Sequence, residues 1–172
     1  MDVIQLVYQN KVYIVLGTNV GNWKNNFRQS LLQLSDLGTI NNFSSVYLSR
    51  PYGYEYQNYF YNMAIELLTK KDPYKLINDL KLIERKLKKK KIIKNGPRTI
   101  DLDIIFYNNL IFNKLFLTIP HPRAHLRDFV LRPIADIDSS FIHPTKKTSI
   151  RNLISQLDEN FTFRKLSNRN LR

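Results

Sequence analysis

The chain has 172 residues, which is enough for one domain with a substantial hydrophobic core. Hydrophobic residues make up 43% of it, with ten Tyr and ten Phe, and this content excludes an intrinsically disordered chain. Cysteine is absent, which excludes a disulfide framework, a thiolate metal site and a Cys nucleophile. The net charge of +13 favours a polyanionic ligand: nucleic acid, an anionic membrane or a small molecule that carries phosphate.

The first part of the chain alternates strand and helix signals. Residues 12–16 form a short apolar, partly β-branched run that ends at Gly17 and predicts a buried strand. Apolar residues at helical spacing predict a helix over 27–34, with Gly38 as its C-terminal cap. No apolar stretch is as long as a membrane span and no signal peptide is visible, so we expect a cytoplasmic protein.

The middle of the chain continues this alternation. Strands are predicted at 45–49 and 63–68, separated by a loop rich in Tyr, Pro and Gly. Asp72 followed by Pro73 marks the start of a second helix, in which apolar residues recur at helical spacing. A last long strand is predicted at 99–107.

The predicted order is strand, helix, strand, strand, helix, strand. This order defines an α+β, ferredoxin-like fold (βαββαβ) with an antiparallel sheet and two helices packed on one face. Residues 120–133 are predicted as a loop, and 150–157 as a short C-terminal helix. We find no repeat or linker, so a single domain over 1–172 is expected, with its core at about 11–158 and peripheral termini.

Two carboxylates stand out in the last strand. Asp101 and Asp103 leave the same face of the strand, with about 7 Å between their Cα atoms. Such a pair suits Mg²⁺ that is bound together with substrate phosphates, because hard oxygen ligands favour this ion. A solvated pair on an edge strand is the alternative, and the pair alone does not decide between the two.

Basic residues cluster around this strand. Arg98 precedes it and could either grip phosphate oxygens or form a salt bridge with an aspartate. Residues 121–129 concentrate His and Arg between two prolines, although the simpler interpretation of His125 is a structural hydrogen bond. The lysine run at 88–91 is most simply a solvated basic helix end, and alternatively a loop that closes over a triphosphate.

Taken together, these segments resemble the hydroxymethyl-dihydropterin pyrophosphokinase family, from residue 12 to about 157. The resemblance rests on several motifs in the same order rather than on one. The motifs are Gly17-Thr18-Asn19-Val20-Gly21, Pro51-x-Gly53-x-x-x-Gln57-x-x-Phe60-x-Asn62, Ile83-Glu84, Gly96-Pro97-Arg98-Thr99-Ile100-Asp101-Leu102-Asp103-Ile104, and Pro120-His121-Pro122-Arg123 with Arg127-x-Phe129-Val130-Leu131-x-Pro133.

The resemblance implies transfer of the diphosphate of ATP to 6-hydroxymethyl-7,8-dihydropterin in folate synthesis, by in-line attack on the β-phosphorus with AMP leaving. Asp101 and Asp103 would hold two Mg²⁺ ions, and the pterin ring would stack between Phe60 and Phe129. The residues implied for pterin binding are Ser49, Arg50, Tyr52, Phe60, Asn62 and Phe129. Those implied for ATP binding are Lys81, Glu84, Lys91, Arg98, Ile104, Thr118, His121 and Arg127. The groups implied for catalysis are Arg98, Lys89, Lys91 and Arg127.

The chain departs from the family pattern at several positions. Lys89 and Lys91 stand where the family usually has arginines, so charge is kept and the bidentate fork is lost. Lys81 replaces a frequent glutamine, and Asn95 a frequent tryptophan. These departures concern turnover and loop closure more than substrate identity.

Two other classes of function compete with this interpretation. An RNA-binding module shares the βαββαβ order and a basic charge, but residues 61–68 lack the aromatic pattern that stacks on bases. Asp101 and Asp103 would also face the polyanion. A scaffold without catalysis is the third possibility, against which the retained aspartates and Arg98 argue. We therefore expect ATP and the pterin as partners of a monomer, with no nucleic acid and no membrane.

Overall fold

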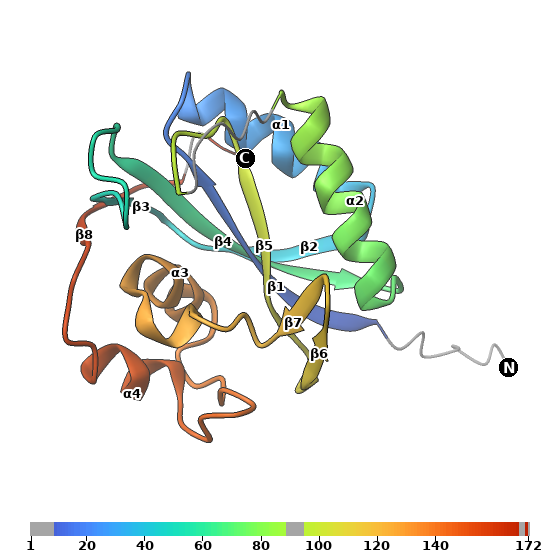
Figure 1. Ribbon diagram of the computed structural model, residues 1–172. Helices are drawn as coiled ribbons and strands as arrows, with labels where there is room; N and C mark the ends of the chain where they lie inside the picture. Colours follow the sequence, from blue (N-terminus) through green and yellow to red (C-terminus); the bar gives the residue numbers. More distant parts are fainter. Residues whose placement is uncertain (1–8, 89–94, 169–170, 172) are drawn as a thin grey trace, which may run out of the picture.

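The computed structural model describes residues 9–88, 95–168 and 171, which form a six-stranded sheet, a two-stranded hairpin and helices on both sides of the sheet (Figure 1). The strands are β1 (Asn10–Thr18), β2 (Thr39–Phe43), β3 (Val46–Ser49), β4 (Phe60–Thr69), β5 (Asp101–Tyr107), β6 (Phe112–Lys114), β7 (Leu117–Ile119) and β8 (Thr162–Leu166). The helices are α1 (Trp23–Ser35), α2 (Pro73–Lys86), α3 (Asp128–Asp138) and α4 (Ile150–Ser155), with a 3-10 turn at Ala124–Leu126.

The main sheet is antiparallel throughout, in the order β5-β1-β4-β3-β8. β2 and β3 pair with successive halves of β4, since Thr39 lies opposite Leu68 and Ser49 opposite Phe60. Between them the ladder is interrupted at Ser44, whose hydroxyl accepts the N–H of Ala64. The predicted ferredoxin-like fold is confirmed, and the strand predicted at 45–49 is the second half of a longer pairing.

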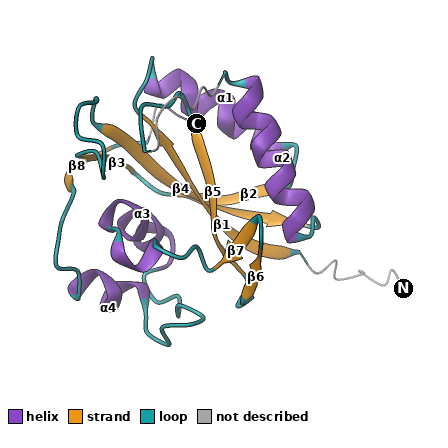
Figure 2. Cartoon of the chain, in the orientation of Figure 1, coloured by secondary structure: helices purple, strands orange, loops and turns teal. Residues whose placement is uncertain are grey.

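Helices α1 and α2 cover one face of the sheet, as predicted (Figure 2). α1 begins at Asn22, whose side chain accepts the N–H of Asn25, and α2 begins at Asp72 with Pro73 as its first residue. Their apolar residues are buried against alternate residues of the strands, which is the packing that the helical spacing predicted. Leu80 of α2, for example, is fully buried in this layer.

The opposite face of the sheet is covered by α3 and α4, and here the sequence prediction was incomplete (Figure 1). The predicted loop over 120–133 is wrong in its second half, because α3 begins at Asp128 and contains Pro133. The helix forms despite the proline because Leu131 and Ile134 are fully buried against the sheet, and this packing outweighs the lost backbone hydrogen bond. α4 lies where a short C-terminal helix was predicted.

Two further predictions need correction. Gly38 does not cap α1, because the helix ends at Ser35 with Asp36 as its C-cap. Gly38 is instead required by close packing, since a Cβ atom there would collide with the carbonyl oxygen of Leu68. Residues 162–166 are not peripheral, because they form β8, which pairs with β3 at the edge of the sheet. No helix in the described part of the chain combines the length and apolar content needed to cross a membrane.

Candidate functional site

Asp101 and Asp103 open onto a cavity beside β5. Asp103 lies opposite Val15 and Asp101 opposite Gly17 of β1, while the intervening Leu102 is fully buried in the layer under α2. This is the alternation of faces that strand geometry predicts. Both carboxylates line a cavity of about 90 Å³ beside the strand.

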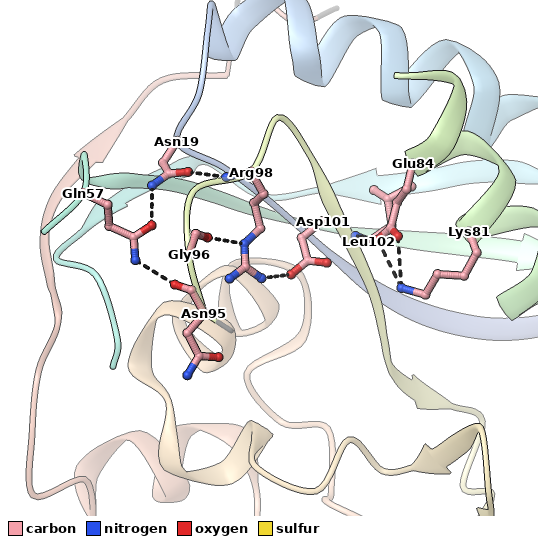
Figure 3. Close-up of polar contacts among 9 residues, drawn as sticks. All are labelled: Asn19, Gln57, Lys81, Glu84, Asn95, Gly96, Arg98, Asp101 and Leu102. Carbon is pink, nitrogen blue, oxygen red and sulfur yellow. Dashed lines mark hydrogen bonds and ion pairs between the residues drawn. The ribbon is translucent and has the colours of Figure 1, made fainter. Parts of the chain in front are cut away.

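Arg98 is fixed beside the carboxylates by contacts from distant segments (Figure 3). Its backbone N–H donates to Asn19 Oδ1 at 2.8 Å, and its guanidinium forms an ion pair with Asp101. Asn19 Nδ2 donates to Gln57 Oε1 at 2.9 Å, and Gln57 Nε2 donates to the carbonyl of Asn95 at 2.7 Å. Asn19 and Gln57 thus hold the segment that carries Arg98. The sequence analysis did not assign this role to the two residues.

Glu84 connects α2 to β5 by a hydrogen bond. Its carboxylate is buried in α2, accepts the N–H of Leu102 at 2.8 Å, and pairs with Lys81 Nζ at 3.1 Å (Figure 3). The resemblance implied that Glu84 contacts ATP, but the structure places it in the interior and outside the cavities that the aspartates line. Its anchor on Leu102 fixes the backbone between Asp101 and Asp103, so it acts as a positioning residue.

The apolar part of the cavity forms a slot between aromatic side chains. The residues predicted for pterin binding all line it: Ser49, Arg50, Tyr52, Phe60, Asn62 and Phe129. At its polar end Asn62 is 4% exposed and its Nδ2 donates to Ser49 Oγ at 3.0 Å. The Asn62 carboxamide therefore lies in the wall of the cavity, where it can meet the polar edge of a ligand.

Two arginines are held against the rings of this slot. The guanidinium of Arg98 lies 5.5 Å from the centre of the Phe60 ring, and that of Arg127 lies 4.8 Å from Tyr52 and 5.7 Å from Phe129. Stacking of this kind orients a guanidinium while leaving its N–H donors at the edge of its plane. The buried Nε of Arg127 has no hydrogen-bond partner among the described residues.

A second, more polar cavity of about 250 Å³ adjoins the slot and shares the two aspartates with it. It is lined by a group of cationic and polar side chains: Lys81, Asn95, Arg98, His121, Arg123 and Arg127. Such a set binds phosphate oxygens by charge and by charge-assisted hydrogen bonds. The aspartates therefore stand between an aromatic slot and a cation-lined cavity.

The cationic surroundings change the titration of two of these groups. Burial, followed by the charges of Arg127 and Arg123, lowers the pKa of His121 to about 4, so the imidazole is neutral at physiological pH. Burial and then Arg123 also lower the pKa of Arg127. His121 can therefore act as a hydrogen-bond partner for a ligand, while the positive charge comes from the arginines and Lys81.

The remaining predicted residues lie at the margin of the site or outside it. The side chain of Ile104 is buried in the core and offers nothing to either cavity. Thr118 on β7 lines a further hollow that it shares with His121, and its hydroxyl donates to Asn113 Oδ1 at 3.1 Å. Lys89 and Lys91, which carried the lid hypothesis, lie outside the described residues.

His125 faces away from the aspartates and packs edge to face on His143, with ring centres 5.9 Å apart. His143 is 2% exposed and also packs edge to face on Phe106. Burial, followed by the charges of His125 and Lys146, lowers the pKa of His143 to about 4. His125 thus makes an aromatic ring contact, and the hydrogen bond expected of it stays a prediction.

We expect this buried imidazole to make stability depend on pH. Between its ordinary pKa of about 6.5 and the native value of about 4, the unfolded chain binds a proton that the native chain does not. The free energy of unfolding should fall as the pH is lowered through this window, and less so in His143→Gln. Urea unfolding at about pH 7 and about pH 5 checks this, with Asn42→Ala on β2, which removes no titratable group, as the control. An unchanged pH dependence in His143→Gln would contradict it.

The residues present fit a divalent cation. The two carboxylates supply hard oxygen ligands on one face, and among the described residues no third His, Asp or Glu joins them to complete a metal site. Mg²⁺ accepts such an incomplete set, because it commonly takes one or two carboxylates and completes its shell with substrate phosphates and water. The cation-lined cavity next to the pair is where those phosphates would lie.

The fold and the site together define an α+β protein in which an aromatic slot and a cation-lined cavity meet at two carboxylates. The chain belongs to the 7,8-dihydro-6-hydroxymethylpterin-pyrophosphokinase (HPPK) family, whose model matches residues 13–139. The motifs that carried the resemblance lie in or next to this span.

Individual relatives agree with this assignment. The chain is 40% identical to the Bacillus subtilis 2-amino-4-hydroxy-6-hydroxymethyldihydropteridine pyrophosphokinase over 130 residues, which is 74% of this chain and 78% of the relative. It is 42% identical over 136 residues to the Dictyostelium discoideum folic acid synthesis protein FOL1, covering 79% of this chain and 21% of that protein. A solved Plasmodium falciparum HPPK-DHPS structure shares the fold, with a TM-score of 0.66, 18% identity, and coverage of 86% of this chain and 44% of that one.

The chain thus spans about a fifth of the length of the FOL1-type relatives and most of the length of the bacterial ones. The two folic acid synthesis proteins contain much sequence beyond the part that this chain matches.

Proposed function

We propose that this protein transfers the diphosphate group of ATP to 6-hydroxymethyl-7,8-dihydropterin and releases AMP, as a step in folate synthesis. The observation that carries the proposal is the position of Asp101 and Asp103 between the aromatic slot and the cation-lined cavity. A flat pterin in the slot and a triphosphate in the cavity would meet at the two carboxylates. The names of the family and of the bacterial relatives give the same pterin and a pyrophosphokinase activity.

In this proposal the apolar slot selects the acceptor. Phe60 and Phe129 supply flat surfaces for the ring, and Asn62 with the backbone around Ser49 supplies hydrogen bonds for its polar edge. A buried polar group that the correct ligand satisfies discriminates strongly, because a wrong ligand leaves it unpaired.

The cavity on the other side aligns the donor. Arg98, Arg127 and Lys81 would bind the phosphate oxygens, and neutral His121 would hydrogen-bond the nucleotide. Asp101 and Asp103 would hold Mg²⁺, which, bound with ATP, neutralises charge on the phosphates. The protein's main contribution is then alignment of the two substrates and electrostatic stabilisation of the developing charge.

The proposed step is a displacement at the β-phosphorus of ATP. The hydroxymethyl oxygen of the pterin forms a bond to this phosphorus, and the bond from the phosphorus to the α,β-bridging oxygen breaks. AMP leaves with the electron pair of the broken bond, and the hydroxyl proton passes to water. No residue is assigned as a general base.

The test is the formation of AMP from ATP and Mg²⁺, followed over time with and without 6-hydroxymethyl-7,8-dihydropterin. AMP that appears only with the pterin supports the proposal. ATP consumption at the same rate with and without the pterin would count against it. So would the absence of ATP consumption by folded protein. A cytoplasmic location, a monomeric state and the absence of nucleic-acid or membrane partners stay predictions.

Replacing Asn62 by alanine should weaken pterin binding specifically. The carboxamide is buried at the polar end of the slot, and its loss removes the hydrogen bonds of a ligand that has no water to replace them. We expect the KM for the pterin to rise about 10- to 100-fold while the KM for ATP stays within about twofold. Asn42→Ala, on the exposed side of β2, is the control. Parallel changes in both KM values would contradict the assigned role.

A further inference from the structure

A buried carboxylate lies next to the aromatic slot and has no role in the proposed reaction. Asp128 is the first residue of α3, lies between Arg127 and Phe129, and is fully buried. Both of its oxygens point to a segment more than thirty residues further along the chain. Oδ1 accepts the N–H of Phe161 at 3.0 Å, and Oδ2 accepts the N–H of Thr162 at 2.8 Å.

The same segment is bound from the other side of the slot. The N–H of Arg50, which follows β3, donates to the carbonyl of Phe161 at 3.0 Å, and its guanidinium donates to the carbonyl of Asn160 at 3.0 Å. The guanidinium also lies 5.8 Å from the centre of the Phe161 ring. Residues 160–162 therefore connect the end of β3 with the start of α3.

The ring of Phe161 contacts both of the rings that line this side of the slot, Tyr52 and Phe129, which also touch each other with centres 6.3 Å apart. It packs edge to face on Tyr52, with ring centres 5.5 Å apart, and on Phe129 at 6.0 Å. Tyr52 follows β3, and Phe129 belongs to α3, so each ring comes from one of the two segments that are tied together. Tyr52 and Phe129 both line the slot, whereas Phe161 does not.

We propose that Asp128 is a positioning residue for the acceptor, which fixes Tyr52 and Phe129 at the wall of the aromatic slot by holding Phe161 against both rings. A buried carboxylate that accepts two backbone N–H groups is rigid, because any movement leaves a buried charge or a buried N–H unpaired. The positions of the Tyr52 and Phe129 rings are therefore set before the pterin enters, and binding does not have to order them. This inference rests on the proposed function.

The α3 helix offers a matched control for Asp128. Asp136 also joins α3 to β3 and β8, since it accepts the hydroxyl of Tyr47 at 2.8 Å and Lys165 Nζ at 2.7 Å, but it lies outside the slot. Phe163 is the control for Phe161, because it lies two residues further along and packs on Tyr59 instead.

The experiment measures dissociation constants for 6-hydroxymethyl-7,8-dihydropterin and for a non-hydrolysable ATP analogue, together with kcat, KM and thermal unfolding of each full-length variant. Asp128→Asn and Phe161→Ala should each raise the Kd and KM for the pterin about tenfold, with kcat and the Kd for the ATP analogue within about twofold. Asp136→Asn and Phe163→Ala should leave the pterin Kd within about twofold even where they lower the unfolding temperature.

Equal effects of Asp128→Asn and Asp136→Asn on pterin binding, or a loss of stability alone, would overturn the inference. If Asp128→Asn does not fold, the pterin Kd values of Phe161→Ala and Phe163→Ala test the inference. These two variants remove a ring and keep the buried carboxylate. Failure of the wild type to bind the pterin would instead reject the proposed function, so the two failures are distinguishable.

Discussion

Replacing Asp103 or Asp101 by alanine should lower pterin-dependent AMP formation by at least about 10³-fold, which is about 4 kcal/mol of transition-state stabilisation. Both carboxylates face the junction of the two cavities, where the charge of the phosphates is concentrated. Without one of them the site loses half of its hard oxygen ligands, and phosphate charge is no longer balanced where the new bond forms. Initial rates of AMP formation at saturating ATP and pterin measure the effect.

The control is Asp79→Ala, which removes a carboxylate of α2 that is ion-paired with Lys71 at 2.9 Å and lies outside both cavities. It should change the rate by less than about twofold. Asp103→Asn adds a second comparison, because it keeps the shape and removes the charge. Wild-type rates from a folded Asp103→Ala protein would remove the metal-site proposal.

Replacing Arg98 by alanine should lower kcat/KM for ATP by about 10²- to 10³-fold. Asn19 holds the backbone of Arg98, while Asp101 and the Phe60 ring orient its guanidinium, so its donors are aligned before ATP binds. Arg98→Lys should recover only a small part of the loss, since a lysine keeps the charge but not the planar fork. Steady-state kinetics with ATP varied at saturating pterin separate the two variants.

Arg151→Ala is the matched control, because this arginine lies on α4 and donates to Ser139 Oγ at 3.0 Å, away from the site. Full recovery of activity in Arg98→Lys would show that charge alone is sufficient. An equal loss in Arg98→Ala and Arg151→Ala would show that surface charge, rather than the position of Arg98, is responsible.

The ferredoxin-like core could be predicted from the sequence because its elements carry strong local signals. The Asp72-Pro73 start and the helical spacing after it mark α2, and the apolar run at 12–16 marks β1. α3 was missed because Pro133 and the His- and Arg-rich stretch before it are typical of a loop, while burial against the sheet is invisible in a local pattern. β8 was missed because its pairing with β3 joins residues more than a hundred positions apart.

Site residues could be predicted from the sequence where their own side chains suit the chemistry. Residues that only hold another site residue in place could not. The alternation of Asp101 and Asp103 with apolar neighbours placed both carboxylates on one face. The role of Asn19 depends on a hydrogen bond to Arg98 across 79 positions, which no local spacing indicates. Glu84 was expected at the nucleotide and lies beneath β5, because its partner Leu102 is known only from the packing of α2 on the sheet.

The structure also bears on the rival interpretation as an RNA-binding module. Such a module stacks bases on the sheet face that its helices leave open. Here that face is covered by α3, whose Leu131 and Ile134 are fully buried against the sheet. The open sheet face on which such a module stacks bases is therefore covered in the described part of this chain.

The central claim is tested most directly by the identity of the group that is transferred. Wild-type protein is incubated with ATP, Mg²⁺ and 6-hydroxymethyl-7,8-dihydropterin, and the pterin and adenine nucleotides are separated and identified by mass spectrometry. Our account predicts a pterin that has gained a diphosphate, together with an equal amount of AMP. A pterin monophosphate with ADP, or an unmodified pterin beside consumed ATP, would contradict it.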